Sequence, residues 1–578
     1  MTHSILPTPR QAEEYAAPGF VTDGCPICVV ADEDKRVIRR AAELARDLGN
    51  ADGTVHPLTH GEGAIVIVRD PSLPTEGYRL TINKGGVRLE GGDAAGAFYA
   101  IVTLQQLVAV YGRELPALTV TDWPDLPHRG YYYDVTRGRV PTVAGIKRIV
   151  DTLVAYKVNA LQLYVEHTFA FREFADRTDA LGAEEILEID TYCRERFVDF
   201  IPSISTFGHL YELLTRPEYR HLCELEDYEA AHHFWLERMA HHTIDPTNPA
   251  SFSLVCSLLD QYLPLFSSEY VNICCDETFD LCQGRNRGKN RGELYTAFVN
   301  ALIGHVAARG KKVMMWADIA LEHPEALAGI PADTVFLNWE YGPSPDPGKA
   351  ARLRAAGRQQ ILCPGTSSWS RLMEDVNVSI PNISRMARIG RDNGAVGLLN
   401  TNWGDFGHPC AFECALYGAV FGACVAWRVD TEANEAYDRA VARLVYGVEE
   451  PMLPLLQELA AAHEATPWQA LFYWNARRDV ACLPGDIPAL KQAIARCTDA
   501  LDRLDKTELN AAVAPYLRVA VRGIRLLNEA ALCIKTQGDP VPWKAKAARW
   551  LSDYEALWRT FDKESELSEI RTFVEKIF

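Results

Sequence analysis

The sequence lacks several features that would assign it to common functional classes. No stretch approaches 18 consecutive apolar residues, which excludes a membrane-spanning helix. Basic residues are in the minority, with 59 Lys and Arg against 77 Asp and Glu, and the net charge is −18. A surface this acidic repels phosphate backbones and anionic lipid heads, so neither nucleic acid nor a membrane is an expected partner.

A secretion signal and a disulfide framework are also missing. The first residues show no basic start followed by an apolar segment, which predicts a cytoplasmic location, although a mature chain that had lost its leader would look the same. The fifteen cysteines are odd in number and have no regular spacing. In a chain of 578 residues they indicate buried or reduced thiols rather than disulfides.

The pattern along the chain divides it into three regions. Residues 1–127 mix helical and strand-like segments and predict a small α+β domain. In residues 128–430 short apolar runs alternate with helical stretches, and in residues 431–578 the pattern is almost entirely helical. The apolar runs, eight in all, are YYYDVTR, NALQLYVE, FVDFIPSI, YVNICCDE, KKVMMWADI, TVFLNWEY, QQILCPGTSS and AVGLLNTNWGD. The fold class is therefore α/β, a (β/α)8 barrel between an α+β domain and a helical domain; an open α/β sheet with extra strands is the alternative.

Function in such a barrel gathers at the carboxyl ends of the strands. Tryptophans stand at four of these ends, interleaved with carboxylates and one arginine, whereas a glycine-rich phosphate loop is absent there. Indoles stack on the apolar faces of pyranose rings, and sugar hydroxyls need charged acceptors and a bidentate donor. The strand ends therefore predict a sugar pocket. Its candidate residues are Arg137, Trp316, Trp339, Trp369, Trp403 and Asp405.

The pair Asp276-Glu277 ends the fourth apolar run and is the candidate for the chemistry. A glycosidic oxygen leaves poorly unless it is protonated, so one carboxyl must donate a proton. Neighbouring residues have Cα atoms about 3.8 Å apart, so the two carboxyls share one wall and can hardly face each other across a sugar. If Glu277 is the acid, the nucleophile comes from elsewhere. It is either another strand-end carboxylate such as Glu340 or the substrate's own 2-acetamido oxygen. In the second case Asp276 would orient the acetamido group and stabilise the positive oxazolinium.

One histidine follows the third strand in the segment STFGHL. Glu166, His209 and Glu277 could form a relay in which the imidazole adjusts the proton affinity of the acid.

These motifs resemble glycoside hydrolase family 20, the β-N-acetylhexosaminidases. HRGYYYDVTRGRVP resembles the first barrel strand of that family, with its pattern R-G-x-x-x-D-x-x-R. NICCDE falls where the family has Gly-Gly-Asp-Glu, TFGHL resembles its Gly-His loop, and NWGDFG resembles its Trp-x-acid segment. The resemblance covers about residues 30–430 and leaves the helical region outside it. It implies an exo-acting enzyme that releases terminal GlcNAc or GalNAc with retention, by substrate-assisted catalysis and without metal or cofactor.

The resemblance also implies roles for single residues. Arg137 would hold the 3- and 4-hydroxyls of the sugar, and Asp405 would accept from the 4- and 6-hydroxyls. Asp276 would orient the acetamido group and Glu277 would be the general acid/base. Trp316, Trp339 and Trp403 would line the pocket for the terminal sugar, while Glu166 and His209 would correspond to the family's carboxylate–histidine relay.

Five positions depart from the family pattern. Cys274-Cys275 replaces the glycine pair, Asn272 stands where a His is common, and Asp405 is one methylene shorter than the usual Glu. Ser370 stands where a Tyr that holds the acetamido carbonyl is expected, just after Trp369. Another group must then supply that hydrogen bond, or acetamido participation is weaker.

Three other functions compete with this interpretation. The first is a two-carboxylate retaining glycosidase with Glu277 as acid and Glu340 as nucleophile. The second is a zinc hydrolase, suggested by Cys274, Cys275, Asp276, Cys282 and His209, although consecutive cysteines on a strand point to opposite faces. The third is a non-catalytic sugar-binding relative. Residue types do not distinguish GlcNAc from GalNAc, nor do they define the linkage, the oligomeric state or the role of the helical region.

Overall fold

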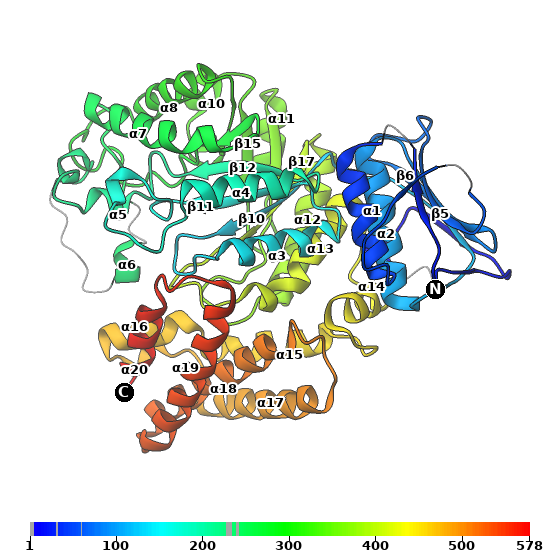
Figure 1. Ribbon diagram of the computed structural model, residues 1–578. Coiled ribbons are helices and arrows are strands. Elements are labelled where there is room, and N and C mark those ends of the chain that lie inside the picture. Colours follow the sequence, from blue (N-terminus) through cyan, green and yellow to red (C-terminus); the bar gives the residue numbers. More distant parts are fainter. Residues whose placement is uncertain (1–4, 31–32, 59–60, 227–233, 239–241) are drawn as a thin grey trace.

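A computed structural model describes residues 5–30, 33–58, 61–226, 234–238 and 242–578 of the chain. Figure 1 shows three regions: a strand-rich N-terminal domain, a central barrel, and a group of helices that packs against the barrel. The predicted limits, 127/128 and 430/431, fall between β9 (Leu118–Asp122) and β10 (His128–Asp134), and between α13 (Leu416–Trp427) and α14 (Glu435–Val441).

The N-terminal domain is a seven-stranded mixed sheet with two helices on one face. The strand order is β1-β9-β6-β7-β5-β3-β4. The other strands are β1 (Gln11–Glu14), β3 (Ile27–Val29), β4 (His56–Pro57), β5 (Ala64–Arg69), β6 (Tyr78–Asn83) and β7 (Gly86–Gly91), with β2 (Phe20–Val21) and β8 (Glu114–Leu115) forming a separate pair. The helices α1 (Lys35–Asp47) and α2 (Ala94–Tyr111) lie between this sheet and the barrel (Figure 1). The predicted α+β character is confirmed.

Helix α2 corrects one expectation. It is long and apolar enough to cross a membrane by length and composition, so the exclusion of any such helix from the sequence was too broad. However, 61% of the helix is buried inside the protein. It packs on β6 and β7, which identifies it as the core helix of this domain.

The central domain is a closed barrel of eight parallel strands, which confirms the predicted (β/α)8 fold and rules out the open sheet. The strands follow one another around the barrel in chain order, and β17 pairs with β10 to close it. They are β10, β11 (Ala160–Val165), β12 (Asp199–Ile204), β13 (Tyr270–Asn272), β14 (Lys312–Trp316), β15 (Val335–Trp339), β16 (Gln359–Cys363) and β17 (Gly397–Asn402). Each of the eight apolar runs coincides with all or part of one strand, because buried parallel strands are apolar on both faces.

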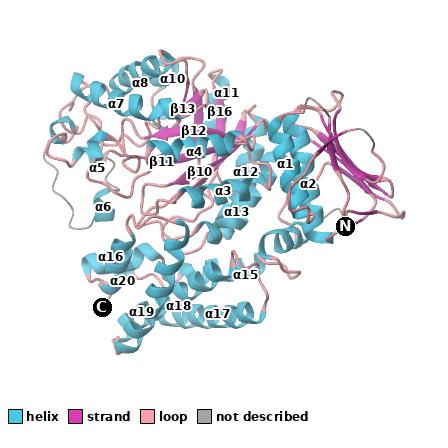
Figure 2. Cartoon of the chain, viewed as in Figure 1, coloured by secondary structure: helices cyan, strands magenta, loops and turns pink. Residues whose placement is uncertain are grey.

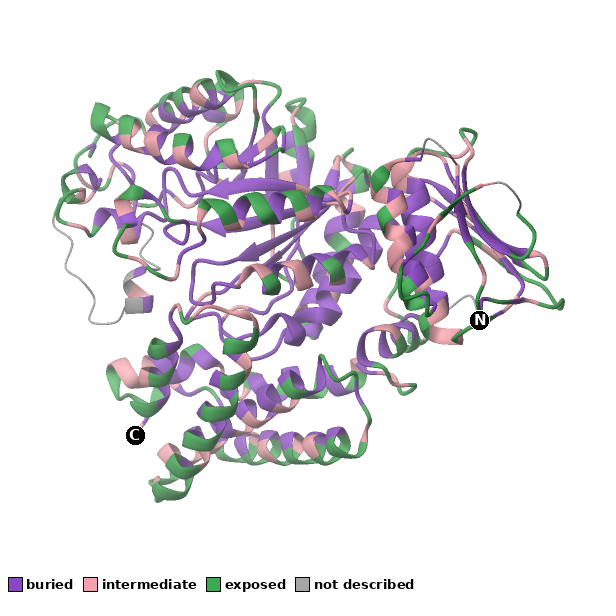
Figure 3. Cartoon of the chain, viewed as in Figure 1, coloured by how far each residue is buried: buried purple, intermediate pink, exposed green. Residues whose placement is uncertain are grey.

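Helices surround the barrel strands, which are buried along their length (Figures 2 and 3). The principal ones are α3 (Val143–Val154), α4 (Ala183–Arg194), α7 (Pro249–Tyr262), α8 (Arg291–Ala307), α9 (Asp318–Glu322), α10 (Pro324–Gly329), α11 (Pro347–Ala355), α12 (Val376–Asp392) and α13. Two shorter helices, α5 (Tyr211–Leu214) and α6 (Phe234–Arg238), follow β12. All fifteen cysteines are unpaired and most are buried, as the sequence predicted.

Residues 431–578, all of which the structure describes, contain helices and no strand, as predicted. The helices are α14, α15 (Leu453–Glu464), α16 (Trp468–Arg477), α17 (Ile487–Lys506), α18 (Ala514–Thr536), α19 (Val541–Phe561) and α20 (Leu567–Glu575).

The two flanking domains contact opposite ends of the barrel. Arg129, at the start of β10, forms an ion pair of 2.8 Å with Glu76 of the N-terminal domain. By contrast, Trp468 of α16 donates from its indole N–H to the carbonyl of Phe406, which lies beyond the end of β17. The helical domain therefore packs at the carboxyl end of the strands, where barrel enzymes place their active sites.

Candidate active site

A cavity of about 200 Å³ opens at the carboxyl end of the barrel strands. Its lining consists of Arg137, His209, Asp276, Glu277, Trp316, Trp339, Tyr341, Trp369, Trp403 and Asp405. Nine of these ten residues were predicted from the sequence, and the barrel brings them together from strand ends far apart in the chain. Glu166 is the predicted site residue that does not line the cavity, and Tyr341 is the lining residue that was not predicted.

The acid pair is carried by an unusual backbone. Cys274, Cys275 and Glu277 all have positive φ angles, of 56°, 64° and 48°. A side chain in this left-handed region costs about 1 kcal/mol or more, which explains why glycine suits these positions. The backbone N–H of Glu277 donates to Oδ2 of Asp318 at 2.9 Å, which helps to hold this conformation. The turn directs both Asp276 and Glu277 into the cavity.

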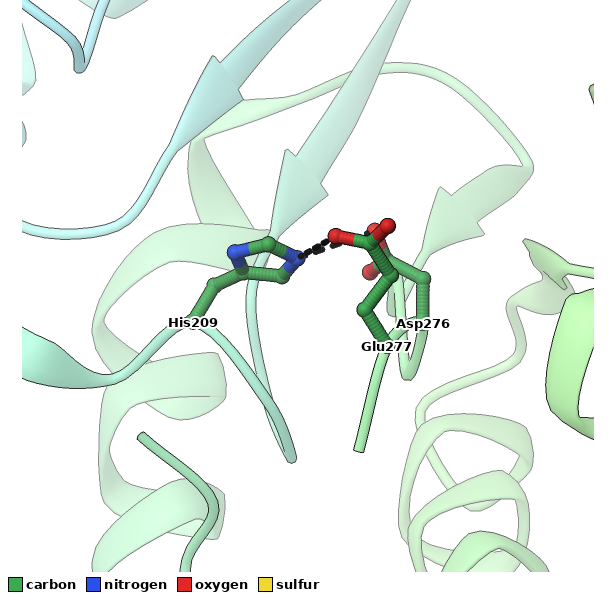
Figure 4. A group of neighbouring side chains, drawn as sticks. All are labelled: His209, Asp276 and Glu277. Carbon is green, nitrogen blue, oxygen red and sulfur yellow. Dashed lines mark ion pairs between the residues drawn. The ribbon is translucent and has the colours of Figure 1, made fainter. Parts of the chain in front are cut away.

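His209 contacts both members of the pair (Figure 4). Its Nε2 atom lies 3.3 Å from Oδ2 of Asp276 and 3.3 Å from Oε2 of Glu277. Burial lowers the pKa of His209, but Asp276 and hydrogen bonding to the two carboxylates outweigh burial and raise it to about 10. Nε2 therefore carries a proton at neutral pH, and it is shared between two carboxylates on the same wall of the cavity.

Arg137 and Asp405 form another part of the cavity lining. Their closest atoms, Nη1 and Oδ1, lie 2.7 Å apart. A third residue, Asp134, fixes the position of both loops, because its carboxylate accepts the backbone N–H groups of Arg137 at 3.1 Å and of Gly404 at 3.0 Å. The shorter side chain of Asp405 thus still reaches the arginine expected to share its hydroxyl ligands.

Aromatic rings form the remaining walls. Trp316 is 1% exposed and packs against Trp403, with ring centroids 5.8 Å apart. Trp339 stacks on Tyr341, with centroids 5.2 Å apart and an angle of 19° between the rings. Trp369 also packs against Tyr341, with ring centroids 5.2 Å apart. The predicted cluster of four tryptophans is therefore a continuous aromatic wall that Tyr341 completes.

Tyr341 also supplies a polar atom to the cavity. Its hydroxyl oxygen accepts a hydrogen bond of 2.8 Å from the indole N–H of Trp403. A phenol that accepts in this way still has its own proton to donate. The residue stands two positions after Trp339, in the run NWEY, and its adjacency to a predicted wall residue was the available signal.

Ser370 does not take the place of the expected tyrosine, since it lies outside the lining of this cavity. Its backbone N–H donates to the carbonyl of Asp405 at 3.2 Å, which ties the loop after β16 to the loop after β17.

The carboxylate of Glu166 contacts Arg137 but does not line the cavity. Oε1 of Glu166 accepts from the hydroxyl of Tyr164 at 2.8 Å and is 3.9 Å from Nε of Arg137. Nη2 of Arg137 is in turn 3.3 Å from Nδ1 of His209. Arg137 thus contacts both members of the predicted Glu166–His209 relay, because its guanidinium is long enough to span the space between them.

The geometry argues against two of the alternative functions in the form predicted. Glu340 does not line the cavity and instead pairs with Lys349, so it is not placed to attack a sugar bound there. The sulfurs of Cys274 and Cys275 have different neighbours: Ser203 at 3.5 Å for the first and Thr206 at 3.2 Å for the second. The two thiols therefore cannot share a zinc ion.

Comparisons with known proteins agree with this geometry. Residues 2–123 match the description "Glycosyl hydrolase family 20, domain 2", and residues 172–375 match "Glycosyl hydrolase family 20, catalytic domain". The fold is shared with a chitobiase from Flavobacterium johnsoniae, at 17% identity and a TM-score of 0.65, over 97% of this chain and 99% of that one.

Curated relatives are similar at the level of sequence. A beta-hexosaminidase from Porphyromonas gingivalis is 26% identical over 63% of this chain and 50% of its own length. A beta-N-acetylhexosaminidase from Cellulomonas fimi is 25% identical over 65% of this chain and 77% of its own length. The chain spans 50% and 60% of the length of the relatives from P. gingivalis and Akkermansia muciniphila. The two matched domains, the barrel and the strand-end motifs together show that this chain belongs to glycoside hydrolase family 20.

Proposed function

We propose that the protein is an exo-acting β-N-acetylhexosaminidase that releases terminal GlcNAc or GalNAc from glycans, with retention and by substrate-assisted catalysis. The observation that carries this proposal is the placement of the carboxylates in the cavity. Asp276 and Glu277 share one wall and one histidine proton, while Asp405 is paired with Arg137. No lining carboxylate thus remains as a separate nucleophile, and the acetamido oxygen of the substrate fills that role.

Glu277 protonates the leaving oxygen in the first step and deprotonates water in the second. Both steps need one carboxyl that alternates between acid and base. The contact between Glu277 and His209 supports this role, because a protonated imidazole stabilises the carboxylate that forms when the proton leaves.

Asp276 acts on the nucleophile. As the acetamido oxygen attacks the anomeric carbon, positive charge develops on the acetamido nitrogen, and a neighbouring carboxylate stabilises it. Tyr341 complements Asp276 by donating its hydroxyl proton to the acetamido oxygen, the contact for which Ser370 is wrongly placed. Stacking between Trp339 and Tyr341 holds the phenol in one orientation.

Arg137 and Asp405 bind the hydroxyls at the far side of the sugar. Their 2.7 Å ion pair leaves further donors on the guanidinium and further acceptor positions on the carboxylate. Trp316, Trp369 and Trp403 enclose the apolar faces of the ring. A cavity of about 200 Å³ fits one terminal sugar residue, which is why we assign exo action.

A panel of 4-nitrophenyl β-glycosides tests this function. We expect release of nitrophenol from the GlcNAc or GalNAc derivative and very little from the glucoside or galactoside, which lack the acetamido nucleophile. Efficient cleavage of the glucoside would favour the two-carboxylate mechanism, and binding without turnover would favour the sugar-binding relative. His209, Asp276 and Glu277 have ligand atoms within 4.8 Å of one another, so metal analysis of the purified protein accompanies the panel.

A further inference from the structure

Two loops of the barrel carry the residues that we assign to the sugar hydroxyls. Arg137 lies in the loop after β10 and Asp405 in the loop after β17, and their side chains form the 2.7 Å ion pair in the cavity. The backbones of the two loops also touch, because a Cβ atom on Gly138 would lie 2.3 Å from the backbone of Gly407. A shift of either loop would therefore displace the other.

The helical domain holds the first of these loops by its backbone. Around the turn from α19 to α20, the N–H of Lys563 donates to the carbonyl of Val140, and the N–H of Thr142 donates to the carbonyl of Phe561, each at 2.8 Å. Figure 1 shows this turn, in red, at the end of the helical group that faces the barrel. The chain just beyond Arg137 is thus paired with the helical domain.

Two aromatic side chains of the helical domain hold the second loop. The indole N–H of Trp468 donates to the carbonyl of Phe406 at 3.0 Å, and the hydroxyl of Tyr554 donates to the carbonyl of Pro409 at 3.0 Å. Both donors are on buried residues. Phe406 directly follows Asp405 in the chain, so the indole of Trp468 fixes the backbone next to a sugar-binding residue.

Arg139, in the first loop, connects both loops with the helical domain. The residue is 3% exposed, and its guanidinium lies 3.9 Å from the ring centroid of Trp558. It forms an ion pair with Asp562 and donates to the hydroxyl of Tyr554 at 3.2 Å. Its Nε donates to the carbonyl of His408 in the second loop at 3.4 Å. One guanidinium has five N–H donors in fixed directions, so a single side chain can make all these contacts.

We propose that Arg139 and Trp468 are positioning residues for the pair Arg137 and Asp405, and that the helical domain thereby takes part in recognition of the 4-hydroxyl of the terminal sugar. The inference rests on the proposed function, in which that pair binds the hydroxyls. Neither positioning residue lines the catalytic cavity, so both act only through the two loops. Hydrogen bonds weaken steeply with distance and angle, so a small displacement of either loop weakens the contacts to the sugar.

The variants Arg139→Lys and Trp468→Phe test the proposal, one from each loop. The lysine keeps the positive charge but loses the fork of donors, and the phenylalanine keeps the ring but loses the N–H. The matched control is Trp543→Phe on α19, because the buried indole of Trp543 donates to the carbonyl of Leu526 at 2.8 Å within the helical domain.

Each protein is assayed with 4-nitrophenyl β-GlcNAc and β-GalNAc and with their 4-deoxy analogue, which is the same compound for both epimers. Thermal midpoints are measured alongside. We expect each variant to lower kcat/KM for the preferred epimer about fivefold, the value of one neutral hydrogen bond. The loss on the 4-deoxy substrate should be about twofold or less, because the contact that the loops position is already missing there.

The control should lower the thermal midpoint and leave both rates unchanged. Equal losses on both substrates, or a control that behaves like the two variants, would mean a general structural role and would overturn the proposal. Unchanged rates in Trp468→Phe would overturn it as well, and this variant decides alone if Arg139→Lys does not fold.

If the wild type cleaves none of the glycosides, the proposed function fails instead. Calorimetric titration of the free N-acetylhexosamines and of their 4-deoxy analogue into the wild type and Trp468→Phe then tests the positioning role. Weaker binding of the 4-hydroxylated sugar alone would support that role, and equal affinities of the two proteins would overturn it.

Discussion

Oδ2 of Asp318 accepts the backbone N–H of Glu277 at 2.9 Å, which links a buried carboxyl to the residue that we assign as the acid. Burial and the nearby charges of Asp276 and Glu277 raise the pKa of Asp318 to about 7. The carboxyl is therefore largely protonated below pH 7 and negatively charged above it. This titration takes place beside the catalytic pair and within the physiological pH range.

Asp318→Asn should move the alkaline limb of the kcat/KM profile to lower pH, by about one unit. Above pH 7 the negative charge of Asp318 disfavours a second charge on Glu277. The asparagine can still accept the backbone N–H but never gains the charge, so Glu277 loses its proton earlier. The measurement is kcat/KM from pH 5 to 9, with the exposed Asp333→Asn as the matched charge control. An unchanged limb would refute this coupling.

The same variant has an effect on stability whose sign follows from the raised pKa. A carboxyl that binds its proton more tightly in the folded protein loses stabilising free energy as the pH rises from about 4 to 7. Asparagine does not titrate, so the variant does not lose this free energy. The difference in thermal midpoint, variant minus wild type, should therefore be larger at pH 8 than at pH 5.

Tyr341→Phe should lower kcat for N-acetylhexosaminides by about tenfold or more, since a hydrogen bond to the developing oxazolinium is lost. KM should change less, because the contact strengthens in the transition state. Ser370→Ala serves as the control and should leave the hydrolysis of aryl glycosides intact. If Ser370→Ala lowered kcat and Tyr341→Phe did not, the hydrogen bond to the acetamido group would come from position 370, as the family pattern indicates.

The architecture could be predicted because each strand is encoded by its own short segment of the sequence. Each barrel strand is an apolar run such as NALQLYVE, since a strand covered on both faces needs apolar residues throughout. Helix α2 shows the limit of such rules: composition alone cannot tell a helix buried on a sheet from one buried in lipid, and only its packing on β6 and β7 decides.

The site was predictable where a residue stands directly at a strand end, as Trp316 and Asp405 do. Tyr341 was missed because its role depends on a contact across the barrel, to Trp403. Asp318 stands at a strand end, as the sequence indicates, but its contact with the backbone of Glu277 could not be predicted. The contact between Glu166 and Arg137 depends likewise on side-chain conformations, which no sequence spacing encodes.

Glu277→Gln should reduce turnover of substrates with poor leaving groups by about 10²–10⁴-fold and spare activated aryl glycosides to some extent. An activated phenol needs less protonation, so the loss of the acid matters less. Comparison of 4-nitrophenyl and unactivated GlcNAc glycosides provides the measurement. An equal loss on both would contradict the role of Glu277 as proton donor.

The central claim is that the substrate supplies the nucleophile and that Asp276 stabilises the positive charge on its nitrogen. Asp276→Asn keeps the size and the hydrogen-bonding ability of the side chain but removes its charge. The most direct test is kcat of this variant on 4-nitrophenyl β-GlcNAc. We predict a loss of about 10²-fold or more with little change in KM, because the charge acts only in the transition state and intermediate. A kcat equal to that of the wild type would contradict substrate-assisted catalysis by this protein.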